Sequence, residues 1–294
     1  MENTIICADV IEGLKKIPDG TVTLICSSPP YNLKIAYASA ADDQPYLDYL
    51  KWLKEVFTEC KRVLRKGGRL VINISAMTNR QSDKGEEYIR PVYVDLGVMM
   101  KSMGMKFFGE HIWYKSDKAP EPNSYGGGQF DGKKTAWGSY MSPSCPAVRR
   151  NHEYILVYSK DQFQLEKSPE SGDPDITAAQ FQLYIASTWS MQPETANIGN
   201  HPVPFCKELP HRCIMLYSYP NDIVLDPFNG VGTTTLMAYI NGRRYIGIDM
   251  EQKYCDCALD RIRHNEYSEV FVPKQKPKKP TAEEFAAGEG CVLE

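Results

Sequence analysis

The feature that most constrains this chain is the regular alternation of short β-rich runs with longer amphipathic segments. Alternating strands and helices favour an α/β fold, in which helices cover both faces of a mostly parallel sheet. The expected strands are Thr4–Ala8, Val22–Ser27, Arg69–Ser75, Phe107–Tyr114, Glu153–Tyr158, Asp222–Asp226 and Tyr245–Asp249. The expected helices are Tyr46–Arg65, Pro91–Met103, Phe205–Tyr217, Thr233–Asn241 and Glu251–Asn265.

The first of these helices has the clearest pattern. Apolar residues recur along it at i, i+3 and i+4, and they are Leu47, Leu50, Leu53, Val56 and Phe57. This spacing predicts one face that packs on the sheet. Lys66-Gly67-Gly68 comes next, and its glycines suit the left-handed backbone that often ends a helix.

Two long stretches interrupt the alternation. Residues 116–150 are rich in Gly, Pro, Ser and aromatic residues, and residues 160–200 are polar with weak periodicity. Connections of this length in a compact α/β domain usually carry a function. We therefore expect one domain over residues 1–267 with two functional insertions, followed by a mobile tail over 268–294, in which Lys and Pro alternate over Pro273–Pro280.

The composition disfavours membrane, secreted and metal-binding proteins. No apolar run approaches the roughly 20 residues that span a bilayer, and the first residues lack the pattern of a signal peptide, so we expect a cytoplasmic protein with no membrane partner. The nine cysteines are scattered, and Cys7 and Cys26 lie in apolar runs, where thiols behave as small core residues. Cys255-Asp256-Cys257 lacks the spacing of zinc ligands, so no metal site is predicted.

Positive charge is concentrated in one part of the chain, although the net charge is −3. Residues 101–150 carry eight Lys or Arg against four acidic residues, interleaved with aromatic side chains. This local balance fits a nucleic-acid-binding surface. It fits a solvated loop with a few buried aromatic residues equally well, so charge alone leaves both interpretations open.

A stiff turn follows the second expected strand. The apolar run Val22–Ser27 leads directly into Ser28-Pro29-Pro30-Tyr31. Proline fixes φ and has no N–H, so nearby carbonyl groups are left to accept hydrogen bonds from a ligand amine. By itself the string favours an ordinary turn capped by a buried tyrosine, and its functional interpretation depends on a second motif.

The second motif is a buried strand, a glycine turn and a helix that opens at a threonine cap. It spans Asp222–Thr234 and contains Asp226-Pro227-Phe228-Asn229-Gly230-Val231-Gly232-Thr233. The order is that of nucleotide-type sites, where ligands bind beyond the carboxyl ends of the strands. Asp249 ends the next strand, where an acid can accept hydrogen bonds from both hydroxyls of a ribose.

The chemistry of the glycine turn selects among nucleotide ligands. A third glycine is missing, and the Asp226 carboxylate would repel a pyrophosphate but attract the ammonium group of an amino acid. A nucleoside that bears an amino acid is S-adenosylmethionine, which we therefore predict as the cofactor. The alternative is that Asp226 and Asp249 only cap the ends of their strands.

Together the two motifs closely resemble those of the DNA amino-methyltransferases that modify cytosine N4 or adenine N6, in the beta arrangement with the catalytic motif first. The family's catalytic motif [DNS]-P-P-[YFW] matches Ser28–Tyr31, and its cofactor motif D-P-F-x-G-x-G-T matches Asp226–Thr233. The resemblance extends to about Tyr267. It implies a Rossmann-like, mostly parallel seven-stranded sheet with a circularly permuted motif order and target-recognition insertions.

The resemblance also implies a set of cofactor-binding residues. Cys7-Ala8-Asp9 resembles the segment near the cofactor's adenine, and His201–Phe205 resembles the segment near its methionine end, although Cys206-Lys207 departs from the commoner Pro-Glu. The predicted cofactor-binding residues are Asp9, Phe205, Asp226, Pro227, Phe228, Gly230, Gly232, Thr233 and Asp249.

In the implied mechanism, Ser28 Oγ and the Pro29 carbonyl accept the two N–H bonds of the base amine, and Tyr31 stacks on the base. The predicted catalytic residues are Ser28, Pro29, Pro30 and Tyr31. A target amine paired inside double-stranded DNA must be flipped into the pocket. Phosphate contacts are expected from Lys133, Lys134, Arg149 and Arg150, with the base-reading side chains elsewhere in the two insertions.

Several alternatives stay open. In resembling enzymes, Ser in the first motif position goes mostly with cytosine N4 and Asp with adenine N6, so cytosine is favoured and adenine is the alternative. A methyltransferase of RNA or of a protein amide is a second possibility, but it has no evident need for the basic insertion. A catalytically silent DNA-binding module is a third, but it would not need both the catalytic and the cofactor motif intact. A restriction endonuclease that acts on the same site is a candidate partner, and both a monomer and a dimer fit the sequence.

Overall fold

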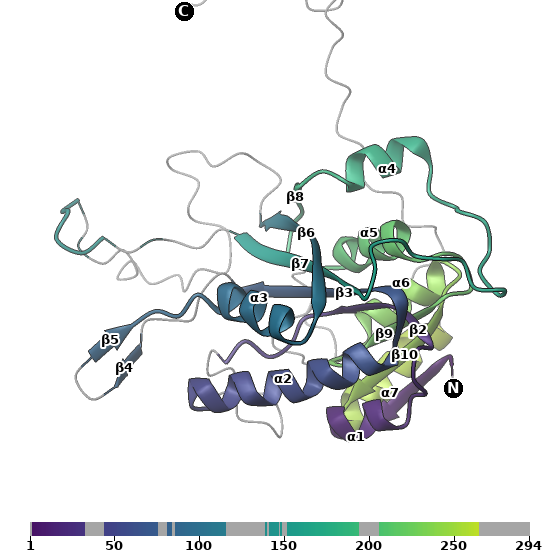
Figure 1. The fold of residues 1–294 in the computed structure, drawn as a ribbon, viewed down its shortest axis with the longest axis horizontal. Coiled ribbons are helices and arrows are strands. Elements are labelled where there is room, and N and C mark those ends of the chain that lie inside the picture. Colours follow the sequence, from purple (N-terminus) through teal and green to yellow (C-terminus); the bar gives the residue numbers. More distant parts are fainter. Residues whose placement is uncertain are drawn as a thin grey trace, which may run out of the picture.

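A central sheet of eight strands organises the described part of the protein (Figure 1). The computed structural model describes residues 2–32, 44–75, 81–83, 86–115, 139, 141–146, 148, 152–193 and 206–264. The sheet has the order β1-β10-β9-β2-β3-β7-β6-β8. Its strands are β1 (Thr4–Cys7), β2 (Val22–Ser27), β3 (Leu64–Ser75), β6 (Met105–Tyr114), β7 (His152–Lys160), β8 (Thr188–Ser190), β9 (Ile223–Asp226) and β10 (Arg244–Asp249).

Within this sheet only β7 runs against its neighbours. It pairs antiparallel with β3 and with β6, and all other neighbouring strands are parallel. Strand β2 is buried along its whole length, as expected of a central strand covered on both faces. The predicted α/β fold with a mostly parallel sheet is confirmed.

Helices cover both faces of the sheet and form two apolar cores. Residues of α1 (Val10–Lys15), α2 (Tyr46–Val63) and α3 (Val92–Ser102) pack on one face, and residues of α5 (Glu208–Tyr217), α6 (Thr233–Ile240) and α7 (Gln252–Arg263) pack on the other. Figure 1 shows α2 and α3 on one side of the sheet and α5 and α6 on the other. Along β2 the faces alternate, with Ile25 in the first core and Leu24 and Cys26 in the second.

Several short elements were missed by the sequence analysis. Strand β8 extends the sheet to eight strands instead of the predicted seven, and it lies with α4 (Ala178–Tyr184) in the second insertion. A hairpin of β4 (Gln81–Asp83) and β5 (Glu86–Tyr88) projects from the body of the domain (Figure 1). Strands of three residues and a helix of two turns carry too few positions for a clear periodicity.

Helix α2 differs from its prediction in two ways. Its buried face includes Tyr49, Leu53 and Val56. Leu47 is 67% exposed, because Tyr46 and Tyr49 occupy the buried face in the first turn instead. The helix ends at Val63 with Leu64 in an extended conformation, so the predicted left-handed glycine end is wrong. Gly67 has a φ of 74° inside β3 instead, where a Cβ atom would lie 2.1 Å from the Gln164 carbonyl oxygen.

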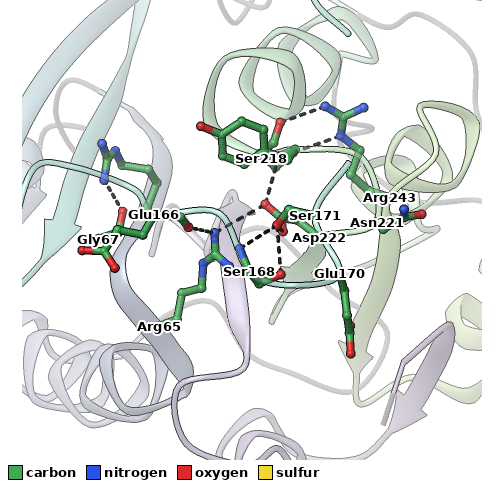
Figure 2. Close-up of polar contacts among 12 residues, drawn as sticks. Arg65, Gly67, Glu166, Ser168, Glu170, Ser171, Ser218, Asn221, Asp222 and Arg243 are labelled. Atoms are coloured by element: carbon green, nitrogen blue, oxygen red, sulfur yellow. Dashed lines mark hydrogen bonds and ion pairs between the residues drawn. The ribbon is translucent and has the colours of Figure 1, made fainter. Parts of the chain in front are cut away.

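Residues 161–176 form the first part of the second insertion, and hydrogen bonds hold them at the amino ends of the parallel strands (Figure 2). Arg65 at the start of β3 donates to the Glu166 carbonyl at 2.6 Å, and Ser171 Oγ donates to Asp222 Oδ1 at 2.6 Å, just before β9. Asp175 accepts from Arg243, just before β10, at 2.8 Å. This stretch therefore lies at the edge of the sheet opposite to the carboxyl ends.

The structure also bears on the compositional predictions. None of the helices in the described ranges is long and apolar enough to cross a membrane. Cys26 is fully buried, as predicted, but the prediction that Cys7 is a core residue is wrong. Cys7 is exposed at the end of β1, where its Sγ lies 3.8 Å from the Met250 carbonyl oxygen.

Candidate active site

The two sequence motifs meet at the carboxyl edge of the sheet. Strands β2 and β9 are neighbours, with Leu24 opposite Val224 and Ile25 opposite Leu225. Parallel neighbours end at the same edge, so the turn after β2 and the glycine loop after β9 lie side by side. Ser27 Oγ donates to Asp226 Oδ1 at 2.5 Å and joins the motifs directly across 199 residues of sequence.

The turn Ser28–Tyr31 is held by contacts from α2 and from the residues that follow it. Tyr49 Oη donates to the Pro30 carbonyl at 2.8 Å, and Asn32, with a φ of 55°, exchanges two hydrogen bonds with Gln44. Among the residues that the structure describes, the Pro29 carbonyl has no hydrogen-bond donor. Ser28 is half-buried, so the edge offers one hydroxyl and one carbonyl to a ligand.

A polar cluster that was not predicted from the sequence lies behind this turn. We call it the hydroxyl network, and its members are Ser28, Tyr31, Asn73, Glu153 and Lys115. Ser28 Oγ donates to Tyr31 Oη at 2.9 Å, and Tyr31 Oη donates to Glu153 Oε2 at 3.1 Å. Asn73 Nδ2 donates to both oxygens at 2.7 Å, and Lys115 Nζ donates to Glu153 Oε1 at 2.5 Å. The available signal was Asn73, a polar residue within the apolar run Leu70–Ile74.

The cofactor loop after β9 takes its shape from two glycines. Gly230 and Gly232 have φ values of 48° and 80°, and a Cβ atom on Gly232 would lie 2.5 Å from that of Ala258 on α7. The Gly230 N–H donates to Asp249 Oδ2 at 2.8 Å, which ties the loop to the end of β10. The predicted threonine cap is wrong, because Gly232 is the N-cap of α6 and Thr233 is its first helical residue.

Side chains from two helices support the same loop. Arg261 of α7 donates to the Val231 carbonyl at 2.6 Å and approaches Thr233 Oγ1 at 3.4 Å. Trp52 of α2 contacts the Phe228 ring, with the ring centroids 5.6 Å apart. Pro227 is buried and Phe228 is half-buried between these supports. Sequence patterns assigned neither Arg261 nor Trp52 to the site, because both lie on ordinary amphipathic helices.

Burial gives the two acidic residues of the site unusual electrostatics. Asp226 is 4% exposed, and burial raises the pKa of its carboxyl group to about 6, against the lowering effect of the Ser27 hydrogen bond. Burial also raises the pKa of Asp249, which accepts the Gly230 and Glu251 N–H groups. An amine that binds here would meet a carboxylate with little competing water.

Asp9 lies at the same edge, because β1 pairs with β10 and Cys7 is opposite Asp249. The Asp9 carboxylate is the N-cap of α1 and accepts from the Ile11 N–H at 2.9 Å. The approach of Asp9 to the cofactor's adenine stays a prediction. Phe205, Lys133, Lys134, Arg149 and Arg150 lie outside the described residues, as does the tail over 268–294.

The family of the chain follows from a match over most of its length. The family model N6_N4_Mtase, described as DNA methylase, matches residues 22–260. The chain belongs to this DNA methylase family. The matched range includes both motifs that meet at the carboxyl edge. The predicted class, a DNA amino-methyltransferase, is confirmed for this methylase.

Two curated relatives resemble the methylase over long stretches. It is 32% identical over 179 residues to the Type II methyltransferase M.MjaVI of Methanocaldococcus jannaschii, a match that covers 61% of this chain and 81% of that protein. It is 29% identical over 287 residues to the DNA adenine methyltransferase YhdJ of Escherichia coli, covering 94% of this chain and 88% of that protein.

Solved structures share the fold. TTHA0409 of Thermus thermophilus, solved as a complex with S-adenosyl-L-methionine, is 24% identical with a TM-score of 0.65, and 91% of this chain and 97% of that chain are covered. The cytosine-N4-specific PvuII DNA methyltransferase is 19% identical with a TM-score of 0.63, covering 89% and 86%. The family and the molecule bound to TTHA0409 agree with the predicted cofactor.

Proposed function

We propose that this methylase transfers a methyl group from S-adenosylmethionine to the exocyclic N4 amine of cytosine in double-stranded DNA. The observation that carries the proposal is the junction of the two motifs, where Ser27 Oγ meets Asp226 Oδ1 at 2.5 Å. It puts a turn with free acceptors beside a glycine loop with a buried carboxylate. The motif order, with Ser28–Tyr31 before Asp226–Thr233, fits the beta arrangement.

The residues around the glycine loop fit S-adenosylmethionine. Asp226 is a buried carboxylate suited to the ammonium group, and Asp249 ends the neighbouring strand, where an acid can accept hydrogen bonds from the hydroxyls of a ribose. Gly230 and Gly232 let the backbone approach a ligand closely. When bound, the cofactor supplies an activated methyl group on a sulfonium. The chain's own task is to hold it in line with the substrate amine.

The turn after β2 fits the substrate amine. The lone pair of an exocyclic base amine is delocalised into the ring, and acceptors on its two N–H bonds favour the tetrahedral geometry of the transition state. In our proposal Ser28 Oγ and the Pro29 carbonyl are these acceptors, Pro30 holds the turn and Tyr31 stacks on the flipped base. Methyl transfer is direct, and the nitrogen afterwards loses its proton to solvent or to an oxygen of the turn.

The first insertion is well placed to bind DNA. Tyr114 ends β6 and pairs with His152 at the start of β7, so both ends of the insertion leave the sheet at the carboxyl edge. Residues 161–176 lie at the opposite edge, which favours residues 116–150 over them for reading bases. We propose that Lys133, Lys134, Arg149 and Arg150 contact phosphates. A cognate endonuclease remains a candidate partner, since M.MjaVI is a Type II methyltransferase.

Adenine N6 is the second candidate substrate. The relative YhdJ, a DNA adenine methyltransferase, matches 94% of this chain, which favours adenine. Ser28 in the first motif position favours cytosine. A hydroxyl can accept from the amine of either base, so Ser28 alone does not decide between cytosine and adenine. The methylated nucleoside that the protein produces decides between them.

The enzyme class is tested by supplying the purified protein with methyl-labelled S-adenosylmethionine and, in parallel, duplex DNA, RNA and a protein substrate. The proposal predicts label in duplex DNA. Label in RNA or protein alone would replace the proposed substrate. A protein that binds DNA and the cofactor without transfer would be a binding module.

A further inference from the structure

The Tyr31 hydroxyl has a role that stacking does not explain. Stacking on a base uses only the ring, which phenylalanine or tryptophan would provide equally well. The Tyr31 hydroxyl nevertheless sits among Ser28, Asn73 and Glu153, at distances of 2.9, 2.7 and 3.1 Å. Asn73 is 2% and Glu153 8% exposed, so this polar contact is built into the sheet and shielded from water.

The direction of each hydrogen bond follows from the donors available. Glu153 pairs with Lys115, whose Nζ donates to Glu153 Oε1 at 2.5 Å, and a carboxylate can only accept hydrogen bonds. Tyr31 therefore gives its single proton to Glu153 Oε2. Between Tyr31 and Ser28 the proton must then come from Ser28 Oγ, as the 2.9 Å contact allows. Asn73 Nδ2 donates to Tyr31 as well and reinforces this direction.

The consequence concerns Ser28, the residue at the proposed substrate amine. Its only proton points toward Tyr31, so its lone pairs are available to an amine at the edge of the sheet. A serine with a freely rotating proton would spend part of its time as a donor and would then oppose the amine. Hydrogen bonds in such a chain also polarise one another, so the charge on Glu153 makes Ser28 a better acceptor.

We propose that Glu153 is a positioning residue that, through Tyr31, orients the Ser28 hydroxyl as an acceptor for the substrate amine. This inference rests on the proposed function, since it assigns Ser28 to that amine. The Glu153 carboxylate contacts Tyr31, Asn73 and Lys115, so it acts on the amine only through Tyr31 and Ser28. It acts from β7, across β3, on the turn after β2, and Lys115 at the end of β6 holds its other oxygen.

The variant Glu153→Gln tests the proposal, because glutamine keeps the size but exposes an amide donor as well as an acceptor. If the glutamine oxygen faces Tyr31, the NH₂ group faces the Lys115 ammonium, which is also a donor. If the NH₂ group faces Tyr31, it donates to the Tyr31 hydroxyl, and the hydrogen bond between these two residues is reversed. We expect the single-turnover rate of methyl transfer to fall roughly 10- to 100-fold. Cofactor and DNA affinities should change less than about threefold, since the Glu153 carboxylate is occupied by Tyr31, Asn73 and Lys115.

A matched control is Glu110→Gln, which removes an exposed carboxylate from the neighbouring strand β6. It should keep the rate of the wild-type protein. A thermal melt of each variant reports folding, and if Glu153→Gln does not fold, Tyr31→Phe serves in its place. That variant keeps the ring, cuts the same chain of hydrogen bonds and should lose rate by a similar factor at unchanged affinities.

A double-mutant cycle separates this role from a merely structural one. In the Tyr31→Phe background the network is already broken, so Glu153→Gln should lower the rate by less than about threefold. The same loss in both backgrounds, or a wild-type rate in either single variant, would overturn the proposal. A wild-type protein that methylates no DNA would instead refute the proposed function, which makes the two failures distinct.

Discussion

Asp226 combines deep burial with a raised pKa. It is a carboxylate at the end of β9, buried to 4% exposure, with Ser27 Oγ and the Phe228 N–H as donors. Burial raises the pKa of Asp226 to about 6, so the ionised form costs stability at neutral pH. A group of this kind is expected where a cationic ligand group repays the cost on binding.

At the residue scale we predict that Asp226→Asn stabilises the cofactor-free protein at pH 7.5 by about 1–3 kcal/mol while weakening cofactor binding at least roughly tenfold. The pKa of Asp226 rises from 3.8 to about 6 on folding, so its contribution to stability is complete below 3.8 and is lost as pH rises through 6. The gain should therefore vanish near pH 4.

Thermal unfolding at the two pH values, together with calorimetric titration of S-adenosylmethionine, checks this prediction. A variant that is destabilised equally at both pH values would show that the hydrogen bonds of Asp226 outweigh its desolvation. Unchanged cofactor affinity would remove Asp226 from the binding site.

Single residues were predictable from the sequence where they belong to a compact motif. Ser28 and Asp226 each follow a buried strand within a recognisable string, and the structure brings both to one edge. Asn73, Glu153 and Lys115 come from three separate strands or their ends, and only the sheet register brings them together. No local pattern marks such a cluster, so the hydroxyl network required the structure.

At the scale of elements, the glycine loop and α7 form one unit. Gly232 starts α6 in a left-handed conformation, and it packs so closely on α7 that a Cβ atom would lie 3.0 Å from the Ala258 Cα atom. Arg261 from the same helix holds the Val231 carbonyl. The loop's shape therefore depends on a helix that follows it in the sequence and carries no recognisable motif.

This packing predicts that Gly232→Ala costs about 1–2 kcal/mol for the left-handed backbone and a further 1–3 kcal/mol for the clash with α7. Gly242→Ala is the matched control, because its φ is 68° but nothing lies within 4 Å of its Cβ position. It should lose only the first contribution and keep cofactor affinity. Urea unfolding and calorimetry measure both, and equal losses in the two variants would contradict the proposed clash.

Long elements were predicted well and short ones poorly. The seven expected strands and five expected helices all have counterparts, because each has enough residues for a periodicity of two or 3.6 to be visible. Strand β8 has three residues, and its place is fixed by tertiary contacts, including Trp113 Nε1 to the Met191 carbonyl and His111 stacked on Trp189 at 4.1 Å. Such contacts leave no trace in local sequence.

At the scale of the whole molecule, the carboxyl edge and the amino edge of the sheet carry different parts of the chain. The carboxyl edge holds the motifs and both ends of the first insertion, whereas the amino edge is closed by residues 161–176 through Arg65, Asp222 and Arg243. The family resemblance predicts that both insertions recognise the target. The sequence contains no signal for the edge at which an insertion leaves a sheet, which only the topology defines.

We predict that replacing both Arg149 and Arg150 by Gln lowers affinity for all DNA sequences alike and reduces the slope of log K against log salt by about 2. Phosphate contacts carry no base information, so sequence preference should stay the same. Replacing Lys51 and Lys54, two exposed cations of α2, is the charge-matched control. A changed sequence preference at an unchanged salt slope would assign the arginines to base reading.

The central claim, methylation of cytosine N4 by the turn after β2, is tested most directly by nucleoside analysis of duplex DNA treated with the protein and S-adenosylmethionine. The account predicts N4-methylcytosine with the wild-type protein and a loss of roughly 100-fold or more with Ser28→Ala, at unchanged cofactor affinity. N6-methyladenine as the sole product would contradict the assigned base, and full activity of Ser28→Ala would contradict the assigned site.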